Sequence, residues 1–463
     1  MALDKITTDI IADDAVTAAK IVSGAVVADI ANDSIDSQHL VAASIDNEHL
    51  ADDAVGTAEL ANDVTISTSG NIATTGSGTL TVAGTSTLTG NATASGNLTV
   101  TGDIVPSTPL SNRNMIINGA MQFAQRVKSV GSGTHGIPYK AVDRFRCTDA
   151  MDVAQVTYEQ TDLTGANIPA AGLMTAHKVS LYGGGTYIDV PAAAEYHNIE
   201  TRLEGLNISH LLYGTASAKT ITLSFYVRSN KNGVWAVQAY TPNGTAYDIG
   251  TTYTVANTDW QRVIWTIPGN TSGTINNAST AGMHIRWWLA AGTDSTATSN
   301  TSWGAEATGR RAYGQTAQLF SDSGNYIEFT GVQLELGSNA TPFEHRSYGE
   351  ELRRCQRYFW RSGGNVNYEI AGIGVMDTAS NTKMLITHPV AMRGTPALTV
   401  NNATGFYHAS KDIDGVAAIS MDVAGISTSM INVNGSFNSI VGYGGRLYNG
   451  SDTTATLDFN SEL

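Results

Sequence analysis

The sequence predicts an all-β protein with a stalk built from short repeats. Three observations predict it. Charged residues make up only 14% of the chain, against about 25% in a typical globular protein, and 47 glycines are present. Short segments alternate apolar and polar residues between turn residues. A ten-residue phrase is repeated five times in the first sixty residues. We expect a decapeptide-repeat shaft over residues 1–63, an intertwined β-stalk over 64–105, a jelly-roll β-sandwich over 106–346, a junction helix over 347–361 and a smaller β-domain over 362–463.

The shaft is predicted from the decapeptides. Copies such as Ala15–Ile21 and Ser34–Leu40 carry an apolar residue at their second position and end on Ile or Leu. One unit is too short to bury these residues, so it needs stacked copies or other chains. We therefore expect a trimer whose core in this region is formed by Val16, Val26, Ile35, Ile45 and Val55.

The next segment has no charged residue between Val64 and Gly102, and its glycines recur every six residues from Gly84 to Gly102. Short alternating phrases between the glycines predict strands, and a single such ribbon would expose its edges. Three chains wound together would pair those edges and bury Leu80, Val82, Leu98 and Val100. The alternative is a disordered linker, because uncharged polar tracts also remain unfolded.

Seven strands are predicted in the sandwich. Residues Ile221, Leu223, Phe225 and Val227 alternate cleanly with polar positions, which is typical of a half-buried strand. Asn232-Gly233 and Asn243-Gly244 suit hairpin turns. The expected strands are Gln155–Glu159, His177–Leu181, Ile221–Arg228, Val234–Tyr240, Gln261–Ile267, Met283–Leu289 and Tyr326–Leu334.

A capping box at Ser347 and Glu350 predicts the start of a helix over Glu350–Trp360. The C-terminal β-domain follows from further short apolar runs between turn residues. Its expected strands are Glu369–Val375, Lys383–Thr387, Ala397–Val400, Ala417–Met421 and Thr428–Val433.

Charge and composition exclude several functions. The formal net charge of −15 repels phosphates, so we expect no nucleic-acid partner and no docking on anionic membranes. We expect no signal peptide, no membrane insertion and synthesis in the host cytoplasm, because the first residues lack a charged and then apolar leader pattern and no apolar run is long enough to span a membrane. Two cysteines, Cys147 and Cys355, are too few for a disulfide framework, and we expect both to be reduced and buried.

No motif predicts catalysis, a cofactor or a metal site. Two pairs of carboxylates are available for glycan hydrolysis, Glu328 with Glu335 and Glu344 with Glu350, but the spacing of seven places Glu328 and Glu335 on opposite faces of a regular strand. Asp412 and Asp414 resemble the start of a calcium loop, yet the acid required at its twelfth position is replaced by Val423. We therefore expect a protein that is not an enzyme.

Aromatic residues are the better candidates for binding, because sugars stack their apolar faces on Trp and Tyr. Trp303 and Tyr313 lie in a long Gly/Thr/Ser-rich stretch, and Trp287 is adjacent to Trp288 on a strand, so that one of the two must face outward. The alternative for each is a place in the core. The candidate glycan-binding residues are Trp303, Tyr313, Trp287 and Trp235.

Four segments resemble a β-sandwich family common in bacteriophage tail fibres. NMIINGAMQFAQR at Asn114–Arg126 is similar to its opening strand, and YKAVDRF at Tyr139–Phe145 to a following segment, with Phe145 in place of the usual Trp. FTGVQLELG at Phe329–Gly337 is similar to its last strand. ATPFEHRSYGEELRRCQRYF at Ala340–Phe359 is similar to its junction helix. The decapeptides also resemble phage fibre shafts.

The resemblance implies a homotrimeric tail fibre in the virion. Its N-terminal region would bind other phage tail proteins, and its later domains would recognise a host cell-surface glycan or protein. The sandwich is similar in architecture to carbohydrate-binding modules, which is an analogy at the level of the fold. Two alternatives stay open: a tailspike-like enzyme that degrades glycan, and a head fibre or decoration protein.

Overall fold

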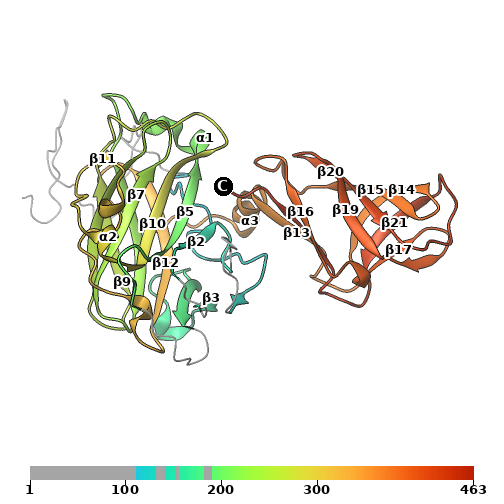
Figure 1. Cartoon of the computed structure of the whole chain (residues 1–463), viewed down its shortest axis with the longest axis horizontal. Helices are drawn as coiled ribbons and strands as arrows, with labels where there is room; N and C mark the ends of the chain where they lie inside the picture. The colour runs from blue at the N-terminus through green and yellow to red at the C-terminus, as the bar shows by residue number, and fades with distance from the viewer. Residues whose placement is uncertain (1–110, 132–138, 140, 152–155, 182–189) are drawn as a thin grey trace, which may run out of the picture. The chain divides into compact units, whose positions relative to one another are not determined.

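The computed structural model describes residues 111–131, 139, 141–151, 156–181 and 190–463. The residues predicted to form the trimer core of the stalk all lie outside these ranges: Val16, Val26, Ile35, Ile45, Val55, Leu80, Val82, Leu98 and Val100. The described part is nearly all β, as predicted, with antiparallel sheets throughout (Figure 1). None of its helices is long and apolar enough to cross a membrane.

Two six-stranded sheets form a sandwich. The first has the order β1 (Ser129–Val130), β3 (Val156–Asp162), β4 (Thr175–Leu181), β12 (Tyr326–Leu336), β6 (Ile221–Ser229) and β9 (Gln261–Ile267). The second has the order β11 (Gly304–Ala305), β8 (Tyr247–Val255), β7 (Gly233–Thr241), β10 (Ala281–Ala291), β5 (Tyr196–Glu204) and β2 (Phe145–Asp149). Two single-turn helices, α1 (Gly205–Ile208) and α2 (Thr293–Thr296), lie in the connections.

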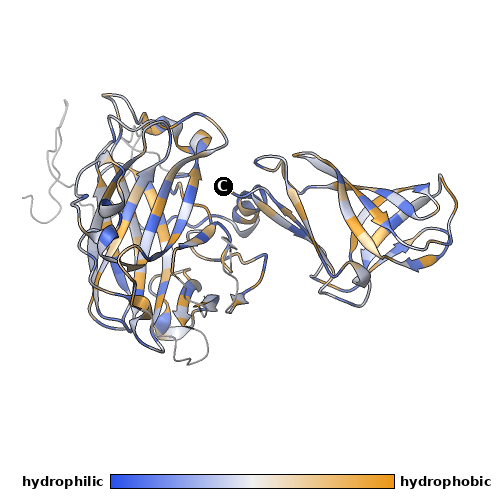
Figure 2. Ribbon diagram, in the orientation of Figure 1, coloured by the Kyte–Doolittle hydropathy of each residue, from blue (hydrophilic) through white to orange (hydrophobic). Residues whose placement is uncertain are grey.

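Alternation along the strands builds the core between the two sheets. The predicted inward residues of β6, among them Leu223 and Phe225, are fully buried. The ring of Phe225 packs edge-on against Trp287 of the opposite sheet, with 5.7 Å between ring centroids. Figure 2 shows the alternation as neighbouring apolar and polar positions along the strands.

Two turn predictions had different outcomes. Asn243-Gly244 connects β7 to β8, and these strands pair from Thr241 and Tyr247 onward, which confirms a hairpin there. Asn232-Gly233 lies between β6 and β7, but β6 pairs with β9 and β12 while β7 belongs to the other sheet. This turn therefore carries the chain from one sheet to the other, and the hairpin prediction was wrong.

The strand β12 corrects the prediction for Glu328 and Glu335. The register with β6 shifts between Thr330 and Gln333, at a bulge where Gly331 has a left-handed φ of 59°. An extra residue in one strand reverses the parity of everything after it. Glu328 consequently pairs with Arg228 and Glu335 with Thr222, so that both acids lie on the outer face of the sheet.

Two further sheets are formed by the residues from Phe359 onward. One has three strands in the order β13 (Phe359–Ser362), β22 (Thr456–Asn460) and β16 (Ala397–Asn401). The other has seven in the order β18 (Ile413–Gly415), β17 (Phe406–Ala409), β21 (Gly444–Asn449), β14 (Ile370–Thr378), β15 (Asn381–Thr387), β20 (Thr428–Asn434) and β19 (Ala418–Ala424). Their shared core contains Phe406, Phe459, Met384, Ile431 and Leu447.

The helix α3 spans Tyr348–Gln356 and starts as the capping box predicts, because the Ser347 hydroxyl accepts a hydrogen bond from the Glu350 amide. It ends four residues before the predicted Trp360, since Phe359–Ser362 pairs with β22 as a strand. Glu350 does not complete the box among the described contacts; its carboxylate instead binds Arg354 one turn later.

The motifs that resemble phage fibres meet at one joint. The Glu351 carboxylate of α3 accepts from the Asn118 amide. The Asn118 side chain donates to the carbonyl oxygens of Phe123 and Asp143, both at 2.9 Å. Gln125 donates to Asp143 and to the Phe359 carbonyl. Polar contacts therefore join motifs that are far apart in sequence. These contacts explain why the motifs carry asparagine, glutamine and acidic residues at these positions.

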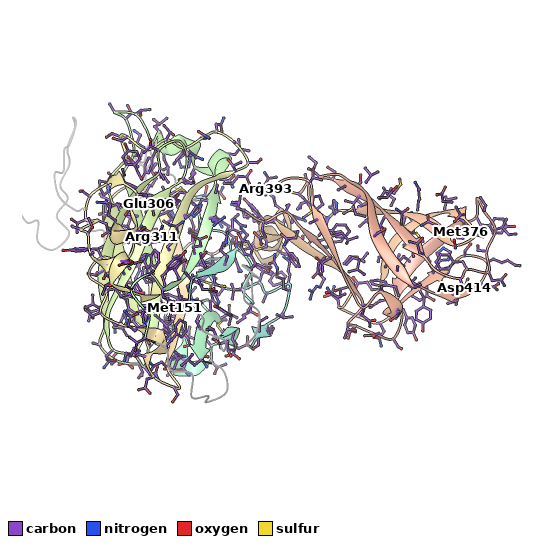
Figure 3. All side chains as sticks on the ribbon, viewed as in Figure 1. Met151, Glu306, Arg311, Met376, Arg393 and Asp414 are labelled. Carbon is purple, nitrogen blue, oxygen red and sulfur yellow. The ribbon has the colours of Figure 1, made fainter. Side chains whose placement is uncertain are left out.

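Arginines hold the residues after β22 against the sandwich. Arg144 is fully buried, binds the Glu462 carboxylate and donates to the Arg202 carbonyl at 2.7 Å. Arg393 donates to the carbonyl oxygens of Ser461 and Glu462 and also to that of Ser279 (Figure 3). We call these contacts the arginine clamp.

A buried histidine gives a pH-dependent prediction. His177 on β4 is fully buried beside the rings of Phe145 and Tyr158, and neither ring nitrogen has a hydrogen-bond partner among the described residues. Burial lowers the pKa of His177 from 6.5 to about 3. The unfolded chain therefore takes up a proton as the pH falls below 6.5, while the folded chain does not, and stability is lost across this window.

We expect His177→Leu to be more stable than the parent, and the difference to grow by about 2–3 kcal/mol between roughly pH 7 and roughly pH 4.5, at about 1.4 kcal/mol per pH unit. Urea denaturation of both proteins at the two pH values measures it. A difference that is the same at both values would contradict the assigned pKa.

Candidate functional site

The four candidate glycan-binding aromatic residues differ in burial. Trp235 and Trp287 are 0% and 1% exposed and belong to the core of the sandwich. No sugar can stack on them, so the binding prediction fails for both, and the alternative of a place in the core holds. Trp303 is half-buried, packs against Tyr213 and donates from Nε1 to the Pro268 carbonyl at 2.6 Å. Tyr313 is the exposed one of the four, at 37%.

The stretch that holds Trp303 and Tyr313 is tied down. Arg310 donates to the Asp248 carboxylate at 2.9 Å and to the carbonyl oxygens of Ser299 and Ser302. Glu306 and Arg311 form an ion pair at 3.0 Å (Figure 3). Trp288, on the outer side of β10, is buried with Ala312 from the same stretch. This stretch therefore covers the outer face of the second sheet. Packing against that sheet explains why the stretch contains aromatic residues.

An open hollow on the outer face of the first sheet has a different character. Its volume is about 540 Å³, and its lining includes Trp260, Tyr326, Arg228, Asp259 and Asn167. Antiparallel pairing positions these groups: Arg228 lies near the end of β6, Tyr326 begins β12, and Trp260 immediately precedes β9. We call this the Trp260 hollow.

Polar contacts fix the rings and leave hydrogen-bonding groups available. Trp260 Nε1 donates to the Asn167 carbonyl at 2.7 Å, and the Arg228 guanidinium lies 4.8 Å from the Trp260 ring centre. Arg228 also donates to the Asn167 amide oxygen at 3.0 Å. The amide nitrogen of Asn167 has no partner among the described hydrogen bonds, and the exposed Asp259 carboxylate accepts from Asn257 on Oδ2 alone.

The charges in the hollow largely cancel. Glu328, one of the two acids brought to this face, pairs with Arg228. What remains is a half-buried indole, a tyrosine ring, an amide donor and a carboxylate acceptor. This set matches the chemistry of a sugar, whose apolar ring face stacks on aromatic rings and whose hydroxyls both donate and accept hydrogen bonds.

The second sheet carries a cluster of charges on its outer face. The fully buried Glu200 contacts Arg286 and Arg202, each at 2.8 Å, and His284 at 3.3 Å. Burial by itself raises the pKa of Glu200, but the hydrogen bond from His284 and the charges of the arginines outweigh it and hold this pKa well below its usual range. Burial lowers the pKa of His284 to about 4, so this side chain is neutral near pH 7. The cluster is internally satisfied and acts as a structural network.

Among the described residues, no group of three or more His, Cys, Asp or Glu side chains is arranged to hold a metal ion. Both cysteines are buried and free of disulfide bonds, as predicted. Burial, first among several causes, raises the pKa of the Cys355 thiol well above its usual value, which disfavours the nucleophilic thiolate form.

Trp260 was not among the glycan-binding residues predicted from the sequence. A signal was present, because Asn257-Thr-Asp-Trp260 puts a bulky aromatic directly after turn residues at the start of a strand. Such a position is at the end of the sheet, where a side chain reaches solvent. The partners Asn167 and Tyr326 lie 93 and 66 residues away, and only the fold brings them together.

No family model and no curated protein matches this sequence. Among solved structures, the enzymatically active domain of bacteriophage CBA120 tailspike protein 4 is 13% identical over 48% of this chain and 21% of that one, with a TM-score of 0.25. A family 4 carbohydrate-binding module is 12% identical over 48% of this chain and 98% of its own length, at 0.25. A cyclase from Fischerella sp. TAU is 10% identical over 51% and 100%, at 0.26.

These structures are distant from this chain, and each match covers about half of it. The chain matches about a fifth of the length of the tailspike domain. They correct one expectation. The sequence predicted a protein that is not an enzyme, whereas the similar structures include an enzymatically active tailspike domain and a cyclase as well as binding modules. Similarity of fold does not separate binding from catalysis here.

Proposed function

We propose that this chain is a bacteriophage tail-fibre protein that attaches the virion to a host cell by binding surface glycans. The observation that carries the proposal is the Trp260 hollow, in which two aromatic rings lie beside hydrogen-bonding groups in an open site of about 540 Å³. The resemblance of Asn114–Arg126 and Ala340–Phe359 to phage fibre segments supports the tail as the place where it acts.

Two kinds of contact would bind a sugar in the Trp260 hollow, ring stacking and hydrogen bonds. A sugar ring would lie against the face of Trp260 or Tyr326 and lose water from its apolar side. Its hydroxyls would then meet the Asn167 amide nitrogen, the Asp259 carboxylate and the Thr258 hydroxyl on the rim. Such a shallow site binds one sugar weakly. We propose a homotrimer joined to other tail proteins through its N-terminal region, in which several sites act together and gain avidity.

Trp260→Ala tests the site. We expect the full-length variant to lose binding to immobilised bacterial surface polysaccharides by tenfold or more, because about 1.4 kcal/mol of stacking corresponds to a factor of ten. The readout is retention on a panel of purified capsular and O-antigen polysaccharides, followed by titration of those that bind.

Tyr313→Ala is the matched control, since Tyr313 is an exposed aromatic outside the hollow. It should bind as the parent does. Equal loss in both variants, or full binding by Trp260→Ala with the same thermal stability as the parent, would overturn the assignment of the site.

A further inference from the structure

Asparagine followed by glycine occurs five times in this chain, and the structure sets one of the five pairs apart. The asparagines are Asn118, Asn232, Asn243, Asn434 and Asn449. In such a pair the backbone nitrogen of the glycine can attack the side-chain amide carbon, since no Cβ atom on the glycine blocks the approach. The attack requires a side chain that can turn toward that nitrogen, so hydrogen bonds that fix the side chain slow the reaction.

Two of the five asparagines are fully buried and fixed at both ends of the amide. The Asn118 nitrogen donates to two carbonyl oxygens, and its oxygen accepts from the Phe123 amide at 3.0 Å. The Asn449 nitrogen donates to the Val366 carbonyl at 2.9 Å, and its oxygen accepts from the Glu369 amide. Neither side chain can turn without leaving buried polar groups unpaired, which is unfavourable.

Two more asparagines are half-buried and held by partners. The Asn243 nitrogen donates to the Ala281 carbonyl at 3.2 Å, and its oxygen accepts from the Asn276 amide at 3.1 Å. The Asn434 oxygen accepts from the side-chain nitrogen of Asn381 at 2.8 Å. These contacts fix the orientation of both amides in the folded protein.

Asn232 differs from the other four. It is exposed, and its side-chain amide has no hydrogen-bond partner among the described residues. It lies in the turn that carries the chain from β6 to β7, where Gly233 begins β7 opposite Val255 and has a φ of 144°. The first pair of a strand opens more often than pairs inside it, and opening frees the glycine nitrogen. Both reacting groups are therefore available at this site.

We propose that Asn232 is a site of spontaneous deamidation. The Gly233 nitrogen forms a bond to Cγ of Asn232 and loses its proton, while the side-chain nitrogen takes up a proton and leaves as ammonia. The product is a five-membered cyclic imide. Water then adds to one of the two imide carbonyls and opens the ring, which gives aspartate or isoaspartate. Water is the only co-reactant, and no atom is oxidised or reduced.

The two products change the site in different ways. Aspartate adds a negative charge next to Lys231, which takes part in no ion pair of the described residues. Isoaspartate also lengthens the main chain by one atom at the start of β7. There the Val234 carbonyl accepts from the amides of Thr316 and Ala317, both at 2.9 Å. The extra atom shifts the contacts that hold the residues after Tyr313 against the second sheet.

Peptide mapping of the full-length protein by mass spectrometry tests this after incubation at mildly alkaline pH, which favours the deprotonated glycine nitrogen. In the folded protein we expect Asn232 to convert at least about tenfold faster than any other Asn-Gly pair, because the other pairs react only from opened states. The same protein unfolded in guanidinium chloride should lose this selectivity, since all five pairs are then equally free.

Two results of this comparison would overturn the proposal. One is an equal or faster conversion at another Asn-Gly pair in the folded protein. The other is conversion of Asn232 in guanidinium chloride but not in the folded protein, because the strand pairing of Gly233 would then protect the site.

Asn232→Gln is the matched variant, because its side chain is one methylene longer and closes the corresponding ring far more slowly. After the same incubation, labelling by an isoaspartyl methyltransferase should fall to a small fraction of that of the parent, with the thermal unfolding of the fresh proteins unchanged. Equal labelling of parent and variant would show that the isoaspartate arises elsewhere and would contradict the proposal. Glycan binding in the Trp260 hollow takes no part in this test, so the result is independent of the proposed function.

Discussion

Replacing Arg144 by Ala is expected to lower the free energy of unfolding by about 3–5 kcal/mol, the cost of breaking a buried ion pair by removing one partner. Arg144 is 1% exposed, and its guanidinium lies 3.5 Å from the centre of the Tyr358 ring. The substitution leaves the buried Glu462 carboxylate with Arg126 alone, at 3.3 Å. It also removes a donor from the Arg202 carbonyl. Urea denaturation followed by tryptophan fluorescence measures the loss.

The backbone does not confound this experiment. Arg144 already has a left-handed φ of 69°, and alanine meets the same strain there, so the change reports on the side chain. Arg354→Ala is the matched control, because Arg354 pairs with Glu350 on the surface of α3. It should cost less than about 1 kcal/mol. A loss of that size for Arg144→Ala would show that the arginine clamp contributes little to stability.

The second large effect is expected for Trp287→Ala. Trp287 is packed between the sheets among Phe145, Phe225 and Phe329, whose ring centres lie 5.7–6.2 Å from its own. Truncating a large aromatic residue in a core costs about 3–5 kcal/mol, because the transfer energy is lost and a cavity remains. The midpoint of urea unfolding should fall accordingly, with little change for Tyr313→Ala at the surface.

This experiment also separates the two interpretations of Trp287 that the sequence allowed. A residue of the core lowers stability when truncated, and a residue that stacks on sugar lowers binding. Unchanged stability together with loss of polysaccharide binding would contradict the burial that the structure shows and restore the binding interpretation.

Local pattern predicted the strands well where burial and alternation agree. The strand β9 has the predicted bounds Gln261–Ile267, and β6 differs by one residue. The strands β5 and β8 were missed. The segment Tyr196–Glu204 carries polar residues at positions that the fold buries, including Glu200 in its arginine cluster. A charged residue is expected at the surface when only its neighbours in sequence are known, because the partners that allow its burial are distant in the chain.

The errors about sites have physical causes of the same kind. The bulge at Gly331 reversed the faces of Glu328 and Glu335, and a strand of regular period contains no sign of it apart from the glycine. Trp235 was assigned to binding although its strand position also suited the core, since the parity of β7 depends on which sheet it joins. The Trp260 hollow needed contacts between segments that no local pattern connects.

The arginine clamp also sets an order of events during synthesis. The strand β22 lies between β13 and β16 and pairs with residues about a hundred positions earlier in the chain. Until Thr456–Glu462 has left the ribosome, Phe359 lacks its strand partner and Arg144 lacks its carboxylate. A chain broken off before this point carries a buried arginine without a counter-charge and an unfinished sheet. Pairing of β22 thus completes both the three-stranded sheet and the ion pair of Arg144, and a chain without this strand exposes both to solvent.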